Sequence, residues 1–217
     1  MQYLSTRDKS LRFASAEAIK MGLSRDGGLF TPVEFPAITA QEIEKLQGMT
    51  YPERAAFVMG KFLSDFSAEE LASFAEKAYG PDKFDHPAAA PLRRVDDSTW
   101  CLELWHGPTC AFKDMALQIL PHLLSASLVK TNEDKTVCIL VATSGDTGKA
   151  ALECFKDVEG TRILVFYPND GVSPMQKLQM TTQTGNNVAV CAIEGNFDDA
   201  QSGVKRIFTD PEISVNK

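Results

Sequence analysis

One lysine stands where its amine could act as a nucleophile. Residues 104–114 read LWHGPTCAFKD, so an expected strand ends, a Gly-Pro turn follows, and Lys113 comes just before an expected helix. The positive end of a helix disfavours a cation and so favours a neutral amine or an imine. A lysine that attacks an aldehyde needs that help. A solvated surface lysine, followed by Asp114 as an ordinary first-turn acid, fits the same spacing.

A second candidate is the loop over residues 142–149, ATSGDTGK, where an apolar strand leads into a helix. Ligands of open α/β sheets bind outside the carboxyl ends of the strands. Glycine lets the backbone approach closely, and free N–H groups with the hydroxyls of Thr143, Ser144 and Thr147 suit an anion. A tight strand-to-helix loop with a hydroxyl helix cap is the alternative. The spacing is not that of a nucleotide-binding GxxxxGK[ST] loop.

Two other polar segments are expected to begin helices. Residues 194–201, EGNFDDAQ, place Asp198 in a helix cap or first turn, and Ser173 precedes proline in residues 173–177, SPMQK. A phosphate contact by the second segment is a weaker alternative. Trp100 and Trp105 are expected to pack in the core rather than to stack on a ligand.

The elements that position these residues alternate after residue 135. Three apolar strands are expected over residues 136–142, 161–167 and 187–193, the first buried on both faces. Helices are expected over about 147–156, 174–184 and 198–208. Alternating strands and helices predict a parallel sheet with right-handed crossovers. An earlier helix over about 114–130 contains Pro121, which should kink or split it.

The region before residue 88 is expected to be mainly helical. Helices are predicted over residues 15–22, from Thr39 as a cap, over residues 51–66, and after Ser67, which begins a capping box. Residues 26–32, DGGLFTP, are expected to form a turn-rich loop. A strand is expected over residues 100–105.

Composition narrows the class of protein. The chain has 217 residues and a net charge of -7, with 44% hydrophobic residues, which is ordinary for a globular protein. The acidic balance without a basic cluster argues against nucleic acid as a partner. No apolar run approaches the roughly 20 residues that span a bilayer. The first residues lack a signal-peptide layout, so a cytoplasmic location is expected.

Cysteine and histidine give no metal signature. The 5 cysteines, at positions 101, 110, 138, 154 and 191, are widely spaced without a CxxC pair. They are expected to be reduced thiols, several of them buried. The 3 histidines do not cluster either.

The motifs together resemble the threonine synthase family. The resemblance rests on segments that follow in the family's order: residues 3–7 (YLSTR), 27–32 (GGLFTP), 106–114 (HGPTCAFKD), 142–148 (ATSGDTG), 167–168 (YP), 173–176 (SPMQ) and 195–201 (GNFDDAQ). It covers essentially the whole chain. The combination is far more specific than any one segment.

The resemblance implies an α/β fold of the type II pyridoxal-phosphate enzymes and the conversion of O-phospho-L-homoserine and water to L-threonine and phosphate. It implies that Lys113 holds pyridoxal 5'-phosphate as a Schiff base and shuttles protons. Asp146 would face the ring oxygen of the cofactor. The substrate carboxylate would bind the loop, through Thr143, Ser144, Gly145 and Thr147.

The resemblance also predicts the domains. Residues 1–90 are expected to form a mainly helical N-terminal domain, residues 91–134 the start of the cofactor-binding large domain, and residues 135–217 a small α/β subdomain. Family members are about twice as long, and no glycine-rich cradle for the cofactor phosphate is found here. A truncated form with an incomplete, inactive site is therefore expected.

Two other functions stay open. A threonine-synthase-like phospho-lyase would give a 2-oxo acid and ammonia, and a non-catalytic α/β module would have no reaction. The oligomeric state is left open by the sequence.

Overall fold

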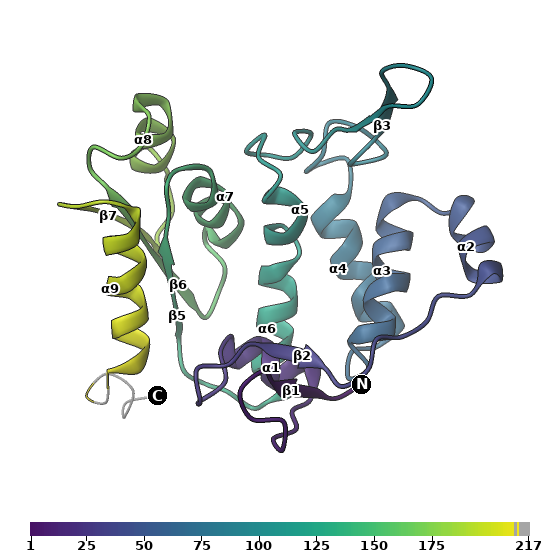
Figure 1. The fold of residues 1–217 in the computed structure, drawn as a ribbon, viewed down its shortest axis with the longest axis horizontal. Coiled ribbons are helices and arrows are strands. Elements are labelled where there is room, and N and C mark those ends of the chain that lie inside the picture. Colours follow the sequence, from purple (N-terminus) through teal and green to yellow (C-terminus); the bar gives the residue numbers. More distant parts are fainter. Residues whose placement is uncertain (211, 213–217) are drawn as a thin grey trace. The chain divides into compact units, whose positions relative to one another are not determined.

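The computed structural model describes residues 1–210 and residue 212. Its helices and strands divide by their contacts into two compact units (Figure 1). The first unit comprises Met1–Gly107 and Gln118–Asp134, and the second comprises Pro108–Leu117 with the described residues from Lys135 onward. The sequence prediction of three domains, divided near residues 90 and 134, stays a prediction.

The first unit is mainly helical, as predicted. Its helices are α1 (Ser15–Met21), α2 (Ala40–Gln47), α3 (Tyr51–Phe62), α4 (Ala68–Tyr79) and α6 (Leu120–Lys130). Its strands form two antiparallel pairs, β1 (Tyr3–Ser5) with β2 (Phe30–Pro32), and β3 (Leu92–Arg94) with β4 (Trp100–Leu102).

Capping side chains set where the helices of this unit begin. The hydroxyls of Thr39, Thr50 and Ser67 each accept a hydrogen bond from the backbone N–H three residues later, and a glutamate side chain returns the bond. These reciprocal bonds satisfy N–H groups that have no partner within the helix. The predicted caps at Thr39 and Ser67 are therefore confirmed.

The core of the first unit lies between paired helices. Helix α3 packs on α4, and α1 packs on α6. Leu71 and Ala75 of α4 are buried, as are Leu123, Leu124 and Leu128 of α6. Such apolar faces, repeating every three or four residues, are what a helix buries against a neighbour.

Proline divides the helix that was predicted over residues 114–130. Helix α5 (Asp114–Leu117) ends before α6 begins at Leu120, and Pro121 lies in the first turn of α6. Proline has no backbone N–H, so it is tolerated at a helix start but not within the helix. The predicted split is confirmed.

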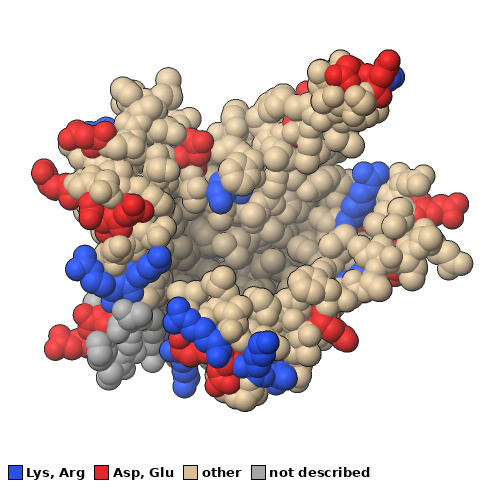
Figure 2. Space-filling view, viewed as in Figure 1, with Lys and Arg blue, Asp and Glu red and all other residues tan. Residues whose placement is uncertain are grey.

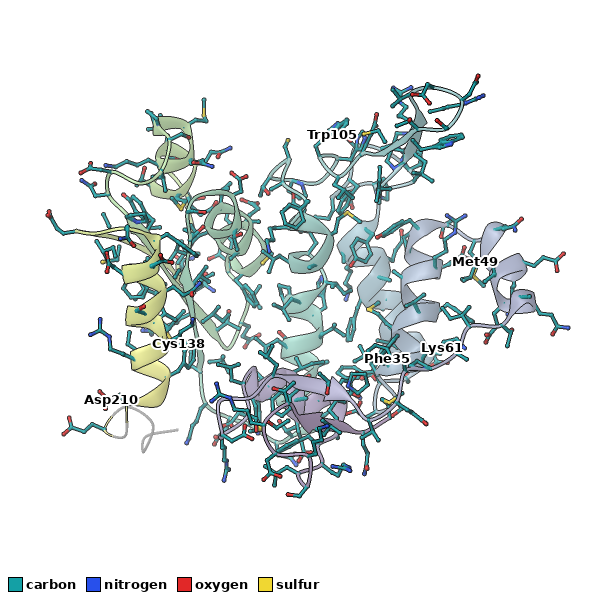
Figure 3. The ribbon with its side chains drawn as sticks, in the orientation of Figure 1. Phe35, Met49, Lys61, Trp105, Cys138 and Asp210 are labelled. Carbon is teal, nitrogen blue, oxygen red and sulfur yellow. The ribbon has the colours of Figure 1, made fainter. Side chains whose placement is uncertain are left out.

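Other expectations for this unit are wrong. The strand predicted over residues 100–105 spans only Trp100–Leu102, and its partner strand and the β1–β2 pair were not predicted. Three-residue strands carry too little alternation to be recognised. Trp100 is 57% exposed and Trp105 is 49% exposed, so neither lies in the core. Figure 3 shows Trp105 close to the β3–β4 hairpin, a two-stranded element with little surface to bury a large ring.

The second unit contains the predicted alternation of strands and helices. Its elements in chain order are α5 (Asp114–Leu117), β5 (Val137–Ala142), α7 (Asp146–Phe155), β6 (Thr161–Pro168), α8 (Pro174–Thr181), β7 (Val188–Ile193) and α9 (Phe197–Thr209). The strands form a parallel sheet in the order β5-β6-β7. The predicted strand and helix positions agree with these bounds within a few residues.

The core of the second unit lies against the central strand. Ile163, Val165 and Tyr167 alternate along β6 and are buried, as are Leu152 and Phe155 of α7. Helix α7 contacts β6 and β5, and α9 also contacts both strands. In Figure 1, α7 and α9 lie on opposite sides of the sheet. This layering fixes the loop between β5 and α7 at the carboxyl end of β5.

Two burial predictions for the second unit are wrong. Strand β5, expected to be buried on both faces, is an outer strand among the described residues, and its Cys138 is exposed (Figure 3). Several of the five cysteines were expected to be buried. Instead, four of the five are exposed and Cys154 is half-buried. An outer strand lacks a neighbour on one edge, and the alternation of a strand does not reveal its place in a sheet.

Acidic and basic side chains share the face that is drawn in Figure 2. On the face that Figure 2 shows, Lys and Arg side chains are interspersed with Asp and Glu side chains rather than gathered into one tract. Within the described part of the chain, no helix combines the length and the apolar character needed to cross a membrane.

Candidate functional site

Lys113 and the loop after β5 belong to the same unit, and α5 contacts α7 there. Lys113 is the residue before α5, and its carbonyl accepts the N–H groups of Ala116 and Leu117. Its side chain is half-buried, with Nζ 4.9 Å from the ring centroid of Phe112. Among the described residues, Nζ has no hydrogen-bond acceptor and no carboxylate partner. The amine is therefore available to a ligand.

The helix that follows Lys113 is shorter than predicted. Helix α5 has 4 residues, one turn. The dipole of a helix grows with the number of aligned peptide groups, so one turn produces a weaker field at Lys113 than the long helix expected from the sequence.

A buried carboxylate shapes the lysine segment. Asp114 is 0% exposed, and its two oxygens accept the backbone N–H and the hydroxyl of Thr109, each at 2.8 Å. The segment between these residues folds back on itself, and Cys110 takes a φ of 57°, which is uncommon for a residue with a Cβ. The Thr109–Asp114 pair therefore holds the backbone that carries Lys113.

Replacing Asp114 with alanine is expected to lower the free energy of unfolding by about 2–3 kcal/mol, because hydrogen bonds to a charged group are lost and a buried N–H is left without an acceptor. Asp114→Asn should lose much less, since Oδ1 can still accept the N–H of Thr109 and Nδ2 can donate to its hydroxyl oxygen. Urea denaturation of both variants measures the difference. Equal losses in the two variants would show that these hydrogen bonds do not stabilise the segment.

Thr143 organises the loop between β5 and α7. Thr143 is 1% exposed, and its hydroxyl oxygen accepts the backbone N–H groups of Gly145 and Gly148, at 3.0 Å and 2.9 Å. Its own backbone N–H continues the sheet by donating to Phe166. The hydroxyl predicted to contact a substrate is thus engaged within the loop. A direct substrate contact by Thr143 stays a prediction.

The remaining loop residues present free donors. In the part of the chain that the structure describes, the backbone N–H groups of Ser144, Asp146 and Thr147 have no protein acceptor, and Ser144 and Asp146 are exposed. These N–H groups lie at or just before the first turn of α7, which has 10 residues. Uncompensated N–H groups at the start of a helix attract an anion. The geometry suits a carboxylate or a phosphate.

Two contacts at this site were not predicted from the sequence. Asp114 lies in the first turn of α5, as one of the two interpretations of the sequence expected, but its burial against Thr109 was not predicted. The segment that contains Gln176 was interpreted as a helix start, with a phosphate contact as the weaker alternative, whereas the Gln176 side chain donates to Asp146 at 2.8 Å. The sequence carries no signal for the second contact, because the two residues are separated by 30 positions.

His106, which precedes the lysine segment, belongs to the first unit. Its Nε2 lies 2.9 Å from Glu103 and its Nδ1 lies 2.6 Å from Asp85. Hydrogen bonds to Glu103 and to Asp85 raise the pKa of His106 above its usual range. The charged imidazole therefore ties these two acidic residues together.

This arrangement predicts a pH-dependent contribution to stability. Because the folded-state pKa of His106 is raised, its contribution is complete below about pH 6.5, the ordinary histidine value, and is lost as the pH rises through the folded-state pKa. The free-energy difference between the wild type and His106→Gln should therefore shrink as the pH rises from about 6 to about 9. Urea denaturation at several pH values measures it. A difference that is constant over this range would contradict the assignment.

Comparison with known proteins places these motifs in a family. A sequence model of the family described as "Threonine synthase N terminus" matches residues 2–79. The chain is 43% identical over 211 residues to threonine synthase from Pseudomonas aeruginosa, covering 97% of this chain and 44% of that protein. It is 38% identical to human "Threonine synthase-like 1", covering 94% of this chain and 28% of that protein.

Solved structures give the same result. The crystal structure of threonine synthase from Brucella melitensis, described as PLP bound, matches with a TM-score of 0.87 and 42% identity, over 98% of this chain and 45% of that one. Threonine synthase from Escherichia coli matches with a TM-score of 0.84 and 32% identity, over 100% of this chain and 48% of that one. The chain thus spans less than half the length of these relatives. The predicted resemblance and α/β fold are confirmed, and the chain corresponds to the N-terminal portion of the threonine synthase family.

Proposed function

We propose that the chain is part of a pyridoxal-phosphate-dependent threonine synthase, which converts O-phospho-L-homoserine and water into L-threonine and phosphate. The observation that carries this proposal is that Lys113 and the loop of residues 143–148 belong to one unit, with α5 against α7. The similarity to threonine synthases along 97% of the chain supports the reaction. The PLP-bound relative from Brucella melitensis supports the cofactor.

The chemistry of the available groups fits this cofactor. The Nζ of Lys113 has no acceptor or acidic partner among the described residues, so an aldehyde could be bound there without breaking an ion pair. Asp146, exposed in the first turn of α7, is the acidic side chain that would face the cofactor ring. The residues that would hold the cofactor are therefore Lys113, covalently through its amine, and Asp146.

Within the proposed reaction, each group has a separate task. Bound pyridoxal phosphate supplies an electron sink for a carbanion. The backbone N–H groups of Ser144, Asp146 and Thr147 would bind and orient the substrate carboxylate. The amine of Lys113, once released by the incoming substrate, would accept a proton at Nζ and return it later as a general acid. Thr143 would act by keeping the loop in shape.

The test is phosphate release. The product of the gene that encodes this chain is expected to release phosphate from O-phospho-L-homoserine when pyridoxal phosphate is added, and to form L-threonine in equal amount. Binding of the cofactor without phosphate release would contradict the proposed reaction while leaving the cofactor proposal in place.

Product analysis separates the alternative reaction. The phospho-lyase reaction is tested alongside the synthase reaction, since the chain is also 38% identical to a relative of a different name, "Threonine synthase-like 1". A phospho-lyase would release phosphate together with a 2-oxo acid and ammonia, and no threonine. Chromatography of the amino-acid and 2-oxo-acid products decides between the two.

A non-catalytic α/β module would neither bind the cofactor nor release phosphate. Absorbance titration with pyridoxal phosphate, followed by borohydride reduction and peptide mapping, tests that possibility directly. The cytoplasmic location stays a prediction from the sequence.

A further inference from the structure

Gln176 of α8 lies against the loop that precedes α7. Its Nε2 donates to Oδ1 of Asp146 at 2.8 Å, and its Oε1 accepts the backbone N–H of Ser173 at 3.0 Å. Its own backbone N–H donates to the hydroxyl of Ser173 at 3.2 Å. Both ends of the amide are thus used. A reversed amide would place an oxygen against the Asp146 carboxylate and an N–H group against the N–H of Ser173, so the orientation is set by the chemistry of both partners.

Helix capping alone does not require glutamine at this position. A capping box accepts glutamate or glutamine three residues after the cap, because either side chain offers an oxygen to the cap N–H. The boxes that begin α3 and α4 use Glu53 and Glu70. Only an amide can cap Ser173 and also donate to the carboxylate of Asp146. The second task accounts for Gln176.

The same amide also covers the backbone of the loop. A Cβ added to Gly145 would lie 2.4 Å from Cδ and from Nε2 of Gln176. Gly145 has a φ of 143°, which side chains other than hydrogen rarely allow. Glycine at position 145 therefore allows both the backbone turn and the close approach of the Gln176 amide. The side chain from α8 packs directly on the loop at this point.

We propose that Gln176 is a positioning residue, which fixes the carboxylate of Asp146 and holds the loop of residues 144–148 in its anion-binding shape. One carboxylate oxygen is held by the amide. Among the described residues, the other oxygen of Asp146 accepts no hydrogen bond, so it stays available to a ligand. Gln176 acts through Asp146 and Gly145 of the loop, and among the described residues it shares no hydrogen bond with Lys113.

The effect of Gln176 on catalysis rests on the proposed function, whereas its effect on the shape of the loop does not. If Asp146 faces the cofactor, the hydrogen bond from Gln176 to one carboxylate oxygen keeps the other oxygen pointing in a constant direction. The side chain then loses less conformational entropy when a ligand binds. The loop should be held in the ligand-free protein as well. This difference allows the two proposals to fail separately.

The experiment compares amide hydrogen exchange of Gly145, Gly148 and Lys149 in the ligand-free protein, because the N–H groups of these three residues are hydrogen-bonded within the loop. Gln176→Glu keeps the capping box but places a carboxylate against Asp146. Exchange in the loop is expected to accelerate about threefold to tenfold, the change that corresponds to loss of one hydrogen bond. The double variant Asp146→Asn, Gln176→Glu again pairs a donor with an acceptor, and it should bring exchange back close to the wild-type rate.

Gln201→Glu is the matched control. It makes the same change of charge in the same unit, on α9, where the side chain accepts a hydrogen bond from Lys205 at 2.8 Å. Loop exchange in this variant should equal that of the wild type. Unchanged exchange in Gln176→Glu, or no recovery in the double variant, overturns the proposal. Accelerated exchange with recovery supports it, even if the protein never releases phosphate, which would count against the proposed reaction alone.

Discussion

In the product of the gene that encodes this chain, replacing Lys113 with alanine is expected to abolish cofactor attachment at this position and to lower phosphate release from O-phospho-L-homoserine by on the order of a thousandfold or more. The physical reason is that no other group can substitute for an amine that both binds an aldehyde and moves protons. Nζ of Lys113 has no protein acceptor among the described residues, so its loss should cause little change in stability. Borohydride reduction with peptide mapping measures the attachment, and a phosphate assay measures the activity.

Lys156→Ala is the matched control for this experiment. Lys156 is an exposed lysine of the same unit, directly after α7 and far along that helix from the loop. Its replacement should leave both attachment and activity unchanged. A fully active Lys113→Ala variant, or borohydride labelling that persists at another lysine, would remove Lys113 from the proposed mechanism. A variant that fails to fold is recognised by its circular dichroism spectrum and is replaced by Lys113→Gln.

Gly148→Ala is expected to lower the free energy of unfolding by up to about 2 kcal/mol, although alanine is the better helix former. The gain in helix propensity is about 1 kcal/mol. Against it, the added Cβ would lie 2.5 Å from Cγ2 of Thr143, 2.9 Å from Sδ of Met180 and 3.0 Å from Cγ1 of Val165. All three side chains are buried, and overpacking a filled core costs about 1–3 kcal/mol. Displacing Thr143 also strains the hydroxyl that orders the loop.

Gly203→Ala is the control, for which a change in stability of the opposite sign is expected. Gly203 lies within α9, and an added Cβ would meet nothing within 4 Å. The propensity gain then acts alone, so this variant should be more stable than the wild type, by up to about 1 kcal/mol. Urea denaturation of the wild type and both variants gives the comparison. Stabilisation by both substitutions would mean that the space around Gly148 can adapt, and that the β5–α7 loop is less closely packed than the structure indicates.

Local patterns in the sequence determined most of the second unit. Apolar runs separated by capping residues predicted β5, β6 and β7 and the helices that follow them, because strand and helix periodicity are properties of short segments. Ser173 caps α8, and Asp198 lies in the first turn of α9, as expected from the polar segments. Lys113 and the loop of residues 142–149 were also recognised in the sequence as candidates for chemistry, as was the family resemblance.

The first unit shows where such patterns stop being informative. Its helices were predicted, but the β1–β2 and β3–β4 pairs were not, since strands of three residues contain only one alternation. Burial was predicted less well than secondary structure. Trp100 was expected in the core, and Cys138 belongs to a strand that was expected to be buried on both faces. Both side chains are exposed, because burial depends on which elements lie beside a strand.

The sequence by itself thus determined which elements form, and which lysine and which loop are the candidates for chemistry. Only the tertiary structure decided how they are held. It buried Asp114 against Thr109, used the hydroxyl of Thr143 inside the loop, and brought Gln176 to Asp146. Caps and periodicities act between residues a few positions apart, so they can be recognised in the chain itself. A hydrogen bond across 30 positions exists only after the sheet and its helices have packed.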